Sequence, residues 1–349
     1  FLRKAPDTPG YKLRTLSGRE IVLTADHPVW TPRGMVDAEQ LRVGDKIGVY
    51  PFEGVTYEEP SDLSIADEST IEHAVVAHGV TKPARAFIEE LRSKGLLPLR
   101  MNSPGLPYIV KLLGYVASGA AELTVHSGVP TLLLHNNTGA RLDLVLKDVR
   151  ALGFESSSLA APQAPTSSML TSRAHVITGA LPLLLLALLR DDSNSPRART
   201  GISRASITPQ WVLTSPLWIR RLYTSALLSG LLSPSSLELV PEAATGLTVR
   251  GLFTSALTDA QASVLRALLR DFEVELSFNE DVSNEGDIEA STAEFSMDED
   301  SMIAFAARVG CDYNPAVLSW LMVSAHYARM MRAVRARRVL STSAVGVGS

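Results

Sequence analysis

The chain has 349 residues, 46% of them hydrophobic, which is enough material for two or three domains with real cores. Its formal net charge of -4 gives no overall attraction to nucleic acid, so a basic contact surface must be local. The one cysteine, Cys311, excludes a disulfide framework and a cysteine-based zinc site. It fits a reducing intracellular compartment, either the cytoplasm or an organelle matrix, or simply an apolar core position.

The longest apolar run extends from Ile177 to Leu189 and contains Pro182. It is far shorter than the roughly 20 residues that span a membrane, so it predicts a buried helix and no membrane partner. The chain begins with Phe1 rather than Met, and we therefore expect a fragment or a processed product.

The first sixty residues carry a β pattern. The run Ile21–Leu23 ends in polar turn residues, and a second run, Lys46–Tyr50, follows Gly44 and Asp45. Thr24 and His27 are three residues apart, so a tight turn can place a hydroxyl and an imidazole on one side. There both groups can donate hydrogen bonds to a strained peptide bond. The alternative is that His27, which precedes a proline, is only a turn residue.

The stretch Gly18–Val29, followed by Leu41–Val49, resembles the second motif of an intein, which has the Hint (hedgehog/intein) fold. The resemblance implies that Thr24 and His27 are catalytic residues that polarise the peptide bond at the upstream splice junction. It also implies an initial Cys or Ser nucleophile and a terminal His-Asn pair. The chain has neither in place. His135-Asn136 lies inside the next domain, where His135 ends a predicted strand and Asn136–Gly139 is interpreted as a loop and helix N-cap. Thr24 and His27 are thus expected to be a remnant splicing motif.

From residue 107 onward, helices and strand pairs occur twice in the same order. The first round is predicted as a helix, two strands and a helix, at Pro107–Ser118, Glu122–His126, Thr131–His135 and Leu142–Leu152. The second round is predicted as a helix, two strands, a helix and a strand, at Leu217–Leu232, Leu237–Leu239, Leu247–Phe253, Ala260–Leu269 and Val274–Phe278. Such a repeat predicts a pseudo-twofold α+β domain.

Two stretches of this repeat, Leu112–Ala120 and Tyr223–Leu231, resemble the two motifs of a LAGLIDADG (DOD-type) homing endonuclease. The resemblance implies an αββαββα repeat whose two motif helices pack side by side. Small residues are needed at the crossing, and Gly114 and Ser225 occupy the third position of each motif. It also implies a carboxylate at the eighth position of each motif, which holds the divalent metals for DNA cleavage.

Gly119 and Gly230 occupy those eighth positions, and glycine has no side chain that can bind Mg²⁺. Glu122 and Glu238 lie three and eight residues further on, so they would have to reach the metals with a different geometry. We therefore expect degenerate metal positions and no enzymatic activity, no cofactor and no small-molecule substrate. Mg²⁺ and site-specific DNA cleavage are expected only if the endonuclease is active after all.

The last helical stretch, Ala316–Val339, carries a cluster of basic residues toward its end, Arg329, Arg332, Arg335, Arg337 and Arg338. Clustered arginines contact backbone phosphates, although cations are also favoured at any helix C-terminus. In contrast, Asn279–Asp300 carries nine acidic side chains and no basic one. That run predicts a solvated or partly disordered loop, which would repel a duplex if it faced the DNA-binding saddle of the endonuclease domain.

These patterns predict five segments along the chain. They are a partial Hint-like β segment at 1–60, a connector at 61–104, a first LAGLIDADG-like half with Ser/Pro-rich connectors at 105–210, a second half with the acidic loop 279–300 at 211–312, and a basic helix and tail at 313–349.

The resemblances imply a catalytically degenerate descendant of an intein with a homing endonuclease domain. Its expected role is that of a nucleic-acid-binding or structural component, with RNA or DNA as the partner, for instance in a ribonucleoprotein such as an organellar ribosome. The alternative is a fragment of an intein whose full precursor self-splices and whose endonuclease domain recognises double-stranded DNA.

Overall fold

The structure is a computed structural model that describes residues 10–15, 20–48, 52–134, 139–160, 173–189, 208–242, 246–254, 257–279 and 293–345. The chain divides into two compact units. Phe1–Glu53 and Ala325–Ser349 make up the first unit, and Gly54–Ser324 makes up the second.

Two antiparallel hairpins form the N-terminal part of the first unit. They pair β1 (Tyr11–Arg14) with β2 (Glu20–Leu23), and β3 (Pro28–Thr31) with β4 (Gly34–Asp37), which the short helix η1 (Ala38–Gln40) follows. The expected strand at 46–50 is absent over its described residues 46–48, because Gly48 instead donates its N–H to the Trp30 carbonyl at 2.8 Å. The β character is confirmed, whereas the Hint-like fold stays a prediction.

The second unit contains the predicted repeat. Its first half consists of α3 (Leu106–Ala117), β7 (Ala121–His126), β8 (Val129–Leu134), α4 (Gly139–Ala151), β9 (Ser157–Ala160), β10 (Arg173–Thr178) and α5 (Ala180–Leu188). Its second half consists of α7 (Leu217–Leu231), β11 (Leu232–Glu242), β12 (Gly246–Phe253), α8 (Asp259–Arg270), β13 (Ser277–Asn279), β14 (Glu294–Met297) and α9 (Glu299–Ala304).

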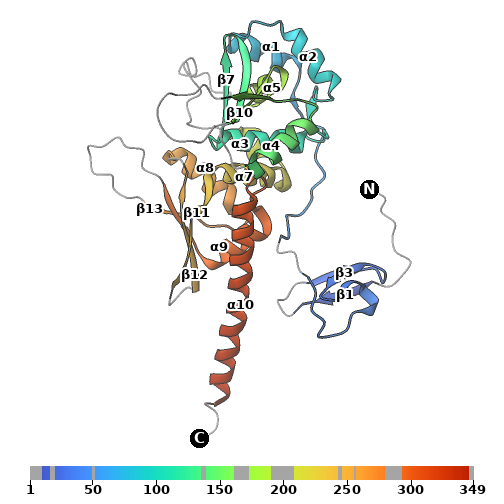
Figure 1. Ribbon diagram of the computed structural model, residues 1–349, viewed down its shortest axis with the longest axis vertical. Helices are drawn as coiled ribbons and strands as arrows, with labels where there is room; N and C mark the ends of the chain where they lie inside the picture. The colour runs from blue at the N-terminus through green and yellow to red at the C-terminus, as the bar shows by residue number, and fades with distance from the viewer. Residues whose placement is uncertain are drawn as a thin grey trace, which may run out of the picture. The chain divides into compact units, whose positions relative to one another are not determined.

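The two halves have the same topology. The antiparallel sheets run in the orders β7-β8-β10-β9 and β11-β12-β14-β13, so equivalent strands take equivalent places. α3 and α7, the first helix of each half, pack against each other between the two sheets (Figure 1). The mixed α and β architecture and its internal repeat are therefore confirmed.

Residues with known helix-capping preferences set the two ends of α3 and the start of α8. α3 begins after Gly105 with Pro107 near its first turn, and it stops at Ser118 because Gly119 adopts a φ of +77°, which favours glycine. α8 begins with a capping box in which Thr258 accepts a hydrogen bond from the Gln261 N–H.

The interval 61–104, expected to be a connector, is instead structured. It contains β5 (Ser64–Ala66), α1 (Glu68–Ala77), α2 (Ala84–Ser93) and β6 (Leu99–Arg100). α1 and α2 pack on α5, whose nine residues are all buried, while α5 also contacts β7, β8 and β10 (Figure 1). The connector prediction was wrong because the apolar face of α2, with Phe87, Ile88 and Leu91 buried, covers this core.

Two smaller expectations also need correction. The apolar run 177–189 is not one helix, since residues 177 and 178 end β10 and α5 begins at Ala180. Within the acidic run, residues 280–292 lie outside the described residues, but β14 and the start of α9 are regular structure. There Asp298 caps α9, and the buried Glu299 accepts the Leu247 N–H at 3.1 Å.

The second unit is completed by α6 (Gln210–Leu213) and by η3 (Phe305–Val309), a π-helical turn that follows α9. α10 (Pro315–Val345) then extends the predicted C-terminal helix at both ends. No helix in the described part of the chain combines the length and the apolar character needed to cross a membrane.

Candidate functional site

The crossing of α3 and α7 lies at the centre of the second unit. A Cβ on Gly114 would collide with the backbone carbonyl of Tyr223 and would lie 3.1 Å from the Leu227 nitrogen. Only glycine permits this approach of the two backbones. Ser225, at the equivalent position of α7, is fully buried. The close packing implied by the two motif stretches is thus present.

The two eighth positions lie where α3 and α7 end. Gly119 follows α3 with nothing within 4 Å of the place where a Cβ would lie. Gly230 lies within α7, where a Cβ would collide with the Ser118 hydroxyl and would lie 3.0 Å from the Ala120 Cβ. Ser118 is itself held by a 2.6 Å hydrogen bond from its hydroxyl to the Tyr115 carbonyl.

These residues do not fit the metal site of an endonuclease. Ser118 fills the space beside Gly230, and Glu122 and Glu238 lie exposed on strands of two different sheets. Within the described residues, no three His, Cys, Asp or Glu side chains form a group that can hold a metal ion. No catalytic step through a metal is derived from this geometry.

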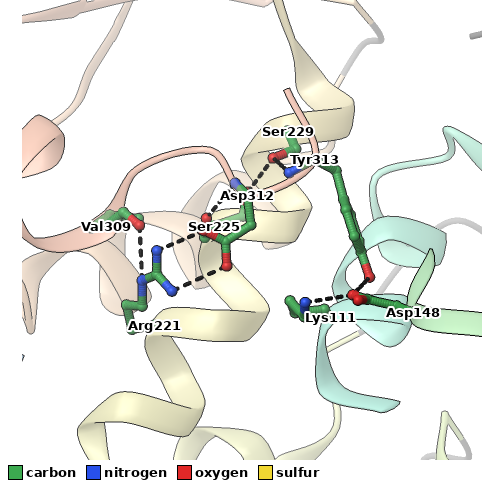
Figure 2. Close-up of polar contacts among 8 residues, drawn as sticks. All are labelled: Lys111, Asp148, Arg221, Ser225, Ser229, Val309, Asp312 and Tyr313. Carbon is green, nitrogen blue, oxygen red and sulfur yellow. Dashed lines mark hydrogen bonds and ion pairs between the residues drawn. The ribbon is translucent and has the colours of Figure 1, made fainter. Parts of the chain in front are cut away.

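A largely buried polar network surrounds the crossing and joins α7 to the loop that precedes α10 (Figure 2). Arg221 of α7 contacts both carboxylate oxygens of Asp312, at 3.0 and 2.7 Å, and donates to the Val309 carbonyl at 3.0 Å. Ser225 Oγ accepts the Asp312 N–H at 2.9 Å, and Ser229 Oγ accepts the Tyr313 N–H at 3.0 Å. Two motif serines thereby fix the loop to α7.

The same loop reaches the first half through Tyr313. Its hydroxyl donates to Asp148 Oδ2 on α4 at 2.6 Å, and Asp148 also forms an ion pair with Lys111 of α3 (Figure 2). Burial, together with the nearby Asp148 carboxylate, raises the pKa of Tyr313 well above its ordinary value of 10.0. Tyr313 is therefore a neutral donor at neutral pH, and the network ties the two halves together.

Cys311 precedes this loop and is fully buried. Burial raises the pKa of its thiol far above the ordinary value, so the group stays a neutral thiol.

Thr24 and His27 form the expected turn, in which the His27 N–H donates to the Thr24 carbonyl at 3.2 Å. The His27 side chain is exposed, and its carbonyl accepts the Ala38 N–H at 2.9 Å. The catalytic role that the resemblance implies for these two residues stays a prediction. His135 and Asn136 lie outside the described residues.

The five arginines of the nucleic-acid prediction all lie in α10. An α-helix turns about 100° per residue, so each three-residue step moves an arginine about 60° around the axis. The backbone positions of Arg329 and Arg338 therefore lie on roughly opposite sides of the helix rather than on one face. Arg329 also forms an ion pair with Glu53 at 3.0 Å.

The open faces of the two sheets carry few cations among their described side chains. On the second sheet Arg250 lies between Glu238 and Ser296, in a row of cross-strand partners, and also pairs with Glu242 at 3.5 Å. On the first sheet the corresponding rows hold Glu122, threonines and His126. These faces offer little positive charge for phosphates.

Sequence reasoning identified the two motif helices and their glycines but missed Lys111, Asp148, Arg221, Asp312 and Tyr313. No sequence pattern indicated the contact between Asp148 and Tyr313, because the two residues are 165 positions apart in the chain. Ser225 and Ser229 indicated that such a network exists, because two hydroxyls on one apolar helix face need buried hydrogen-bond partners.

No protein-family model matches the chain. It is 28% identical over 333 residues to tRNA-splicing ligase RtcB of Pyrococcus abyssi, a match that covers 91% of this chain and 33% of that protein. It is 35% identical over 150 residues to tRNA-splicing ligase RtcB of Methanocaldococcus jannaschii, covering 42% of this chain and 14% of that protein. DNA-directed RNA polymerase subunit Rpo1N of the same organism is 26% identical over 227 residues, covering 62% of this chain and 16% of that protein.

The chain thus spans a third or less of the length of these relatives. Among solved structures, the homing endonuclease I-DmoI in complex with DNA and Mn is 10% identical, with a TM-score of 0.36 and coverage of 59% of this chain and 97% of that chain. Full-length DUF199/WhiA from Thermatoga maritima is 12% identical, with a TM-score of 0.34 and coverage of 79% of this chain and 75% of that chain.

These relatives correct the functional interpretation. Proteins 27–35% identical to this chain carry the name tRNA-splicing ligase, which describes the joining of RNA. The interpretation as a degenerate intein-derived component of a ribonucleoprotein, and its intein-fragment alternative, are therefore wrong and are not carried forward. The expected absence of a metal cofactor stays a prediction.

Proposed function

We propose that this chain is a module of a longer protein related to tRNA-splicing ligase RtcB, and that the longer protein joins RNA ends. The observation that carries this proposal is the similarity to the Pyrococcus abyssi ligase over 91% of the chain. Because the chain covers 33% of that relative, the ligation is assigned to the longer protein.

The module's own role in this proposal is to bind nucleic acid. An RNA polymerase subunit is similar to 62% of the chain, so similar segments occur both in a protein named as a ligase and in one named as a polymerase subunit. A segment common to a ligase and a polymerase cannot owe its presence to ligation alone. Both names describe proteins that work on nucleic acids, which favours binding of nucleic acid as the shared property.

The repeat and the arginines of α10 are considered separately for that role, because those arginines belong to the first unit. We interpret the paired helices α3 and α7 with their two sheets as a LAGLIDADG-type arrangement, in keeping with the motif resemblance. Since the described open faces of the sheets hold mainly acidic and neutral side chains, the phosphate contacts are assigned to the arginines of α10, of which Arg332 and Arg335 are central.

Fluorescence anisotropy of the 349-residue chain with labelled single-stranded RNA and duplex DNA tests the proposed binding, in a series of salt concentrations. The expected result is binding whose logarithmic association constant falls linearly with the logarithm of the salt concentration. Binding that is absent at low salt for both nucleic acids contradicts the proposal.

A further inference from the structure

Residues 54–63 form an extended segment, here called the strap, that lies on the second unit without being part of its core. They belong neither to a helix nor to a strand, and none of them is buried. The strap is held at both of its ends, and its partners at those ends belong, like the strap, to the second unit. Its attachment is therefore a property of that unit alone.

The first end of the strap is attached to η3 and to the start of α7. The Gly54 N–H donates to the Ala307 carbonyl at 2.9 Å, in the last turn of η3, where carbonyls lack partners within the helix. The Tyr57 ring stacks on the Trp218 ring, with centroids 5.9 Å apart and an interplanar angle of 27°. The Trp218 indole N–H also donates to the Glu58 carbonyl at 2.9 Å.

The second end of the strap is attached at β6. Asp62 Oδ1 accepts a hydrogen bond from Arg100 at 2.6 Å, and the Leu63 carbonyl accepts the Met101 N–H at 2.9 Å. The Asp62 side chain is 71% exposed, and exposed ion pairs of this kind stabilise little. Tyr57 at the first end is 69% exposed as well. The attachment thus buries little apolar surface at either end.

This small set of contacts opposes the conformational entropy of the whole strap. Each ordered residue costs backbone freedom, whereas the hydrogen bonds of the strap are exchanged for hydrogen bonds to water when it leaves. The Tyr57–Trp218 stack is the one contact of the strap that joins two aromatic rings. Segments with few buried apolar contacts and exposed hydrogen bonds open locally before a core does.

We propose that the strap is releasable: it detaches from η3, α7 and β6 as one unit while the helix pair α3–α7 stays folded, and the Tyr57–Trp218 stack is its main attachment. Release frees residues 54–63, a length of chain of up to about 33 Å, between Glu53 and β5. The strap thereby sets the length of the free chain through which the N-terminal hairpins are joined to the second unit.

Hydrogen exchange followed by NMR tests the strap in the 349-residue chain. The reporters are the Trp218 indole N–H and the Gly54 and Met101 amides, because each donates a hydrogen bond that release breaks. The indole signal is assigned by its loss in Trp218→Phe. We expect the three reporters to share one opening constant, to exchange at least about tenfold faster than amides in the middle of α3, and to be insensitive to low urea.

Tyr57→Ala removes the stack and should speed the exchange of all three reporters about tenfold. The amides of α3 should not change, because the exposed Tyr57 side chain is no part of the core. Tyr57→Phe is the matched control, since it keeps the ring and should exchange like the parent chain.

Reporters that exchange as slowly as α3 overturn the proposal, because the strap then opens only with the whole unit. Reporters that exchange as fast as those of a free peptide overturn it too, because the strap is then not attached. Exchange that Tyr57→Ala leaves unchanged, or speeds at one reporter only, contradicts release as one unit from this stack. No RNA enters the measurement, so its result is independent of the proposed function.

Discussion

The Ser118 side chain fills the space beside Gly230, so that a Cβ added at Gly230 would lie 2.5 Å from the Ser118 Cβ and would collide with its hydroxyl. The two residues come from the two halves of the repeat, at the ends of α3 and α7. A carboxylate at position 230 therefore requires a different residue at position 118, and the pair explains why both positions are small.

Gly230→Ala is expected to destabilise the chain by about 2 kcal/mol, because the new methyl group overpacks against Ser118. Ser118→Gly in the same chain should recover part of that loss. Gly119→Ala is the matched control: its cost of about 1 kcal/mol comes from the positive φ, and Ser118→Gly should not relieve it. Urea unfolding measures the three single variants and the two double variants, and additive costs of Gly230→Ala and Ser118→Gly would contradict the contact.

Gly114→Ala should cost about 3 kcal/mol or more, because its methyl group meets the backbone of Tyr223, which no rotamer change can move. Gly79→Ala is the comparison. That glycine has a φ of +61° and open space around it, so only the backbone strain of about 1 kcal/mol applies. If urea unfolding gives equal losses for the two variants, the close approach of α3 and α7 is not required for stability.

Asp148→Ala removes the partner of both Lys111 and Tyr313, and it should cost about 3 kcal/mol because a largely buried ammonium is left without its counter-charge. Lys111→Met in the same chain should recover much of this loss by removing that charge. Denaturant unfolding of the single and double variants checks the result. An Asp148→Ala variant as stable as the parent chain would show that the network does not hold the halves together.

Tyr313 should make the stability of the fold depend on alkaline pH. Its pKa is raised in the folded state, so its contribution is fully present below the ordinary pKa of 10.0. The contribution is lost as pH rises above that value, because the unfolded chain ionises its tyrosine first. Unfolding free energies between pH 8 and about 11 should fall less steeply for Tyr313→Phe than for the parent chain. Identical slopes would exclude this linkage.

Arg332→Ala with Arg335→Ala should weaken binding to RNA or DNA and lower the salt slope by about 2, since each neutralised phosphate contributes about 0.9. Arg85→Ala is the matched control, because it removes one exposed arginine from α2, where Arg85 pairs with Glu89. Anisotropy titrations at several salt concentrations measure the slopes. An unchanged slope in the double variant would remove α10 from the proposed interface.

Much of the second unit could be predicted because its elements have strong local patterns. The apolar periodicity in α3, α4, α7 and α8 placed each helix to within a few residues, and the order of elements revealed the repeat. α1 and α2 carry local signals too, including the capping box of Asp67 and Thr70, which the connector interpretation of 61–104 did not use.

The site was predicted only where it depends on local features. The glycines at 114, 119 and 230 belong to motif stretches, so their positions at the helix pair followed from the resemblance. The Asp148–Tyr313 and Arg221–Asp312 contacts depend on how distant segments fold together, which no periodicity encodes. The strand expected at 46–50 is absent over its described residues 46–48, because the Gly48 N–H bonds to β3 without continuing a ladder.

The most direct test of the proposed function compares RNA joining by the longer protein with RNA joining by the 349-residue chain, using two labelled RNA strands resolved on a denaturing gel. The proposal predicts a joined product with the longer protein, and binding without joining for the chain alone. A longer protein that joins no RNA, or a joined product made by the chain alone, would contradict it.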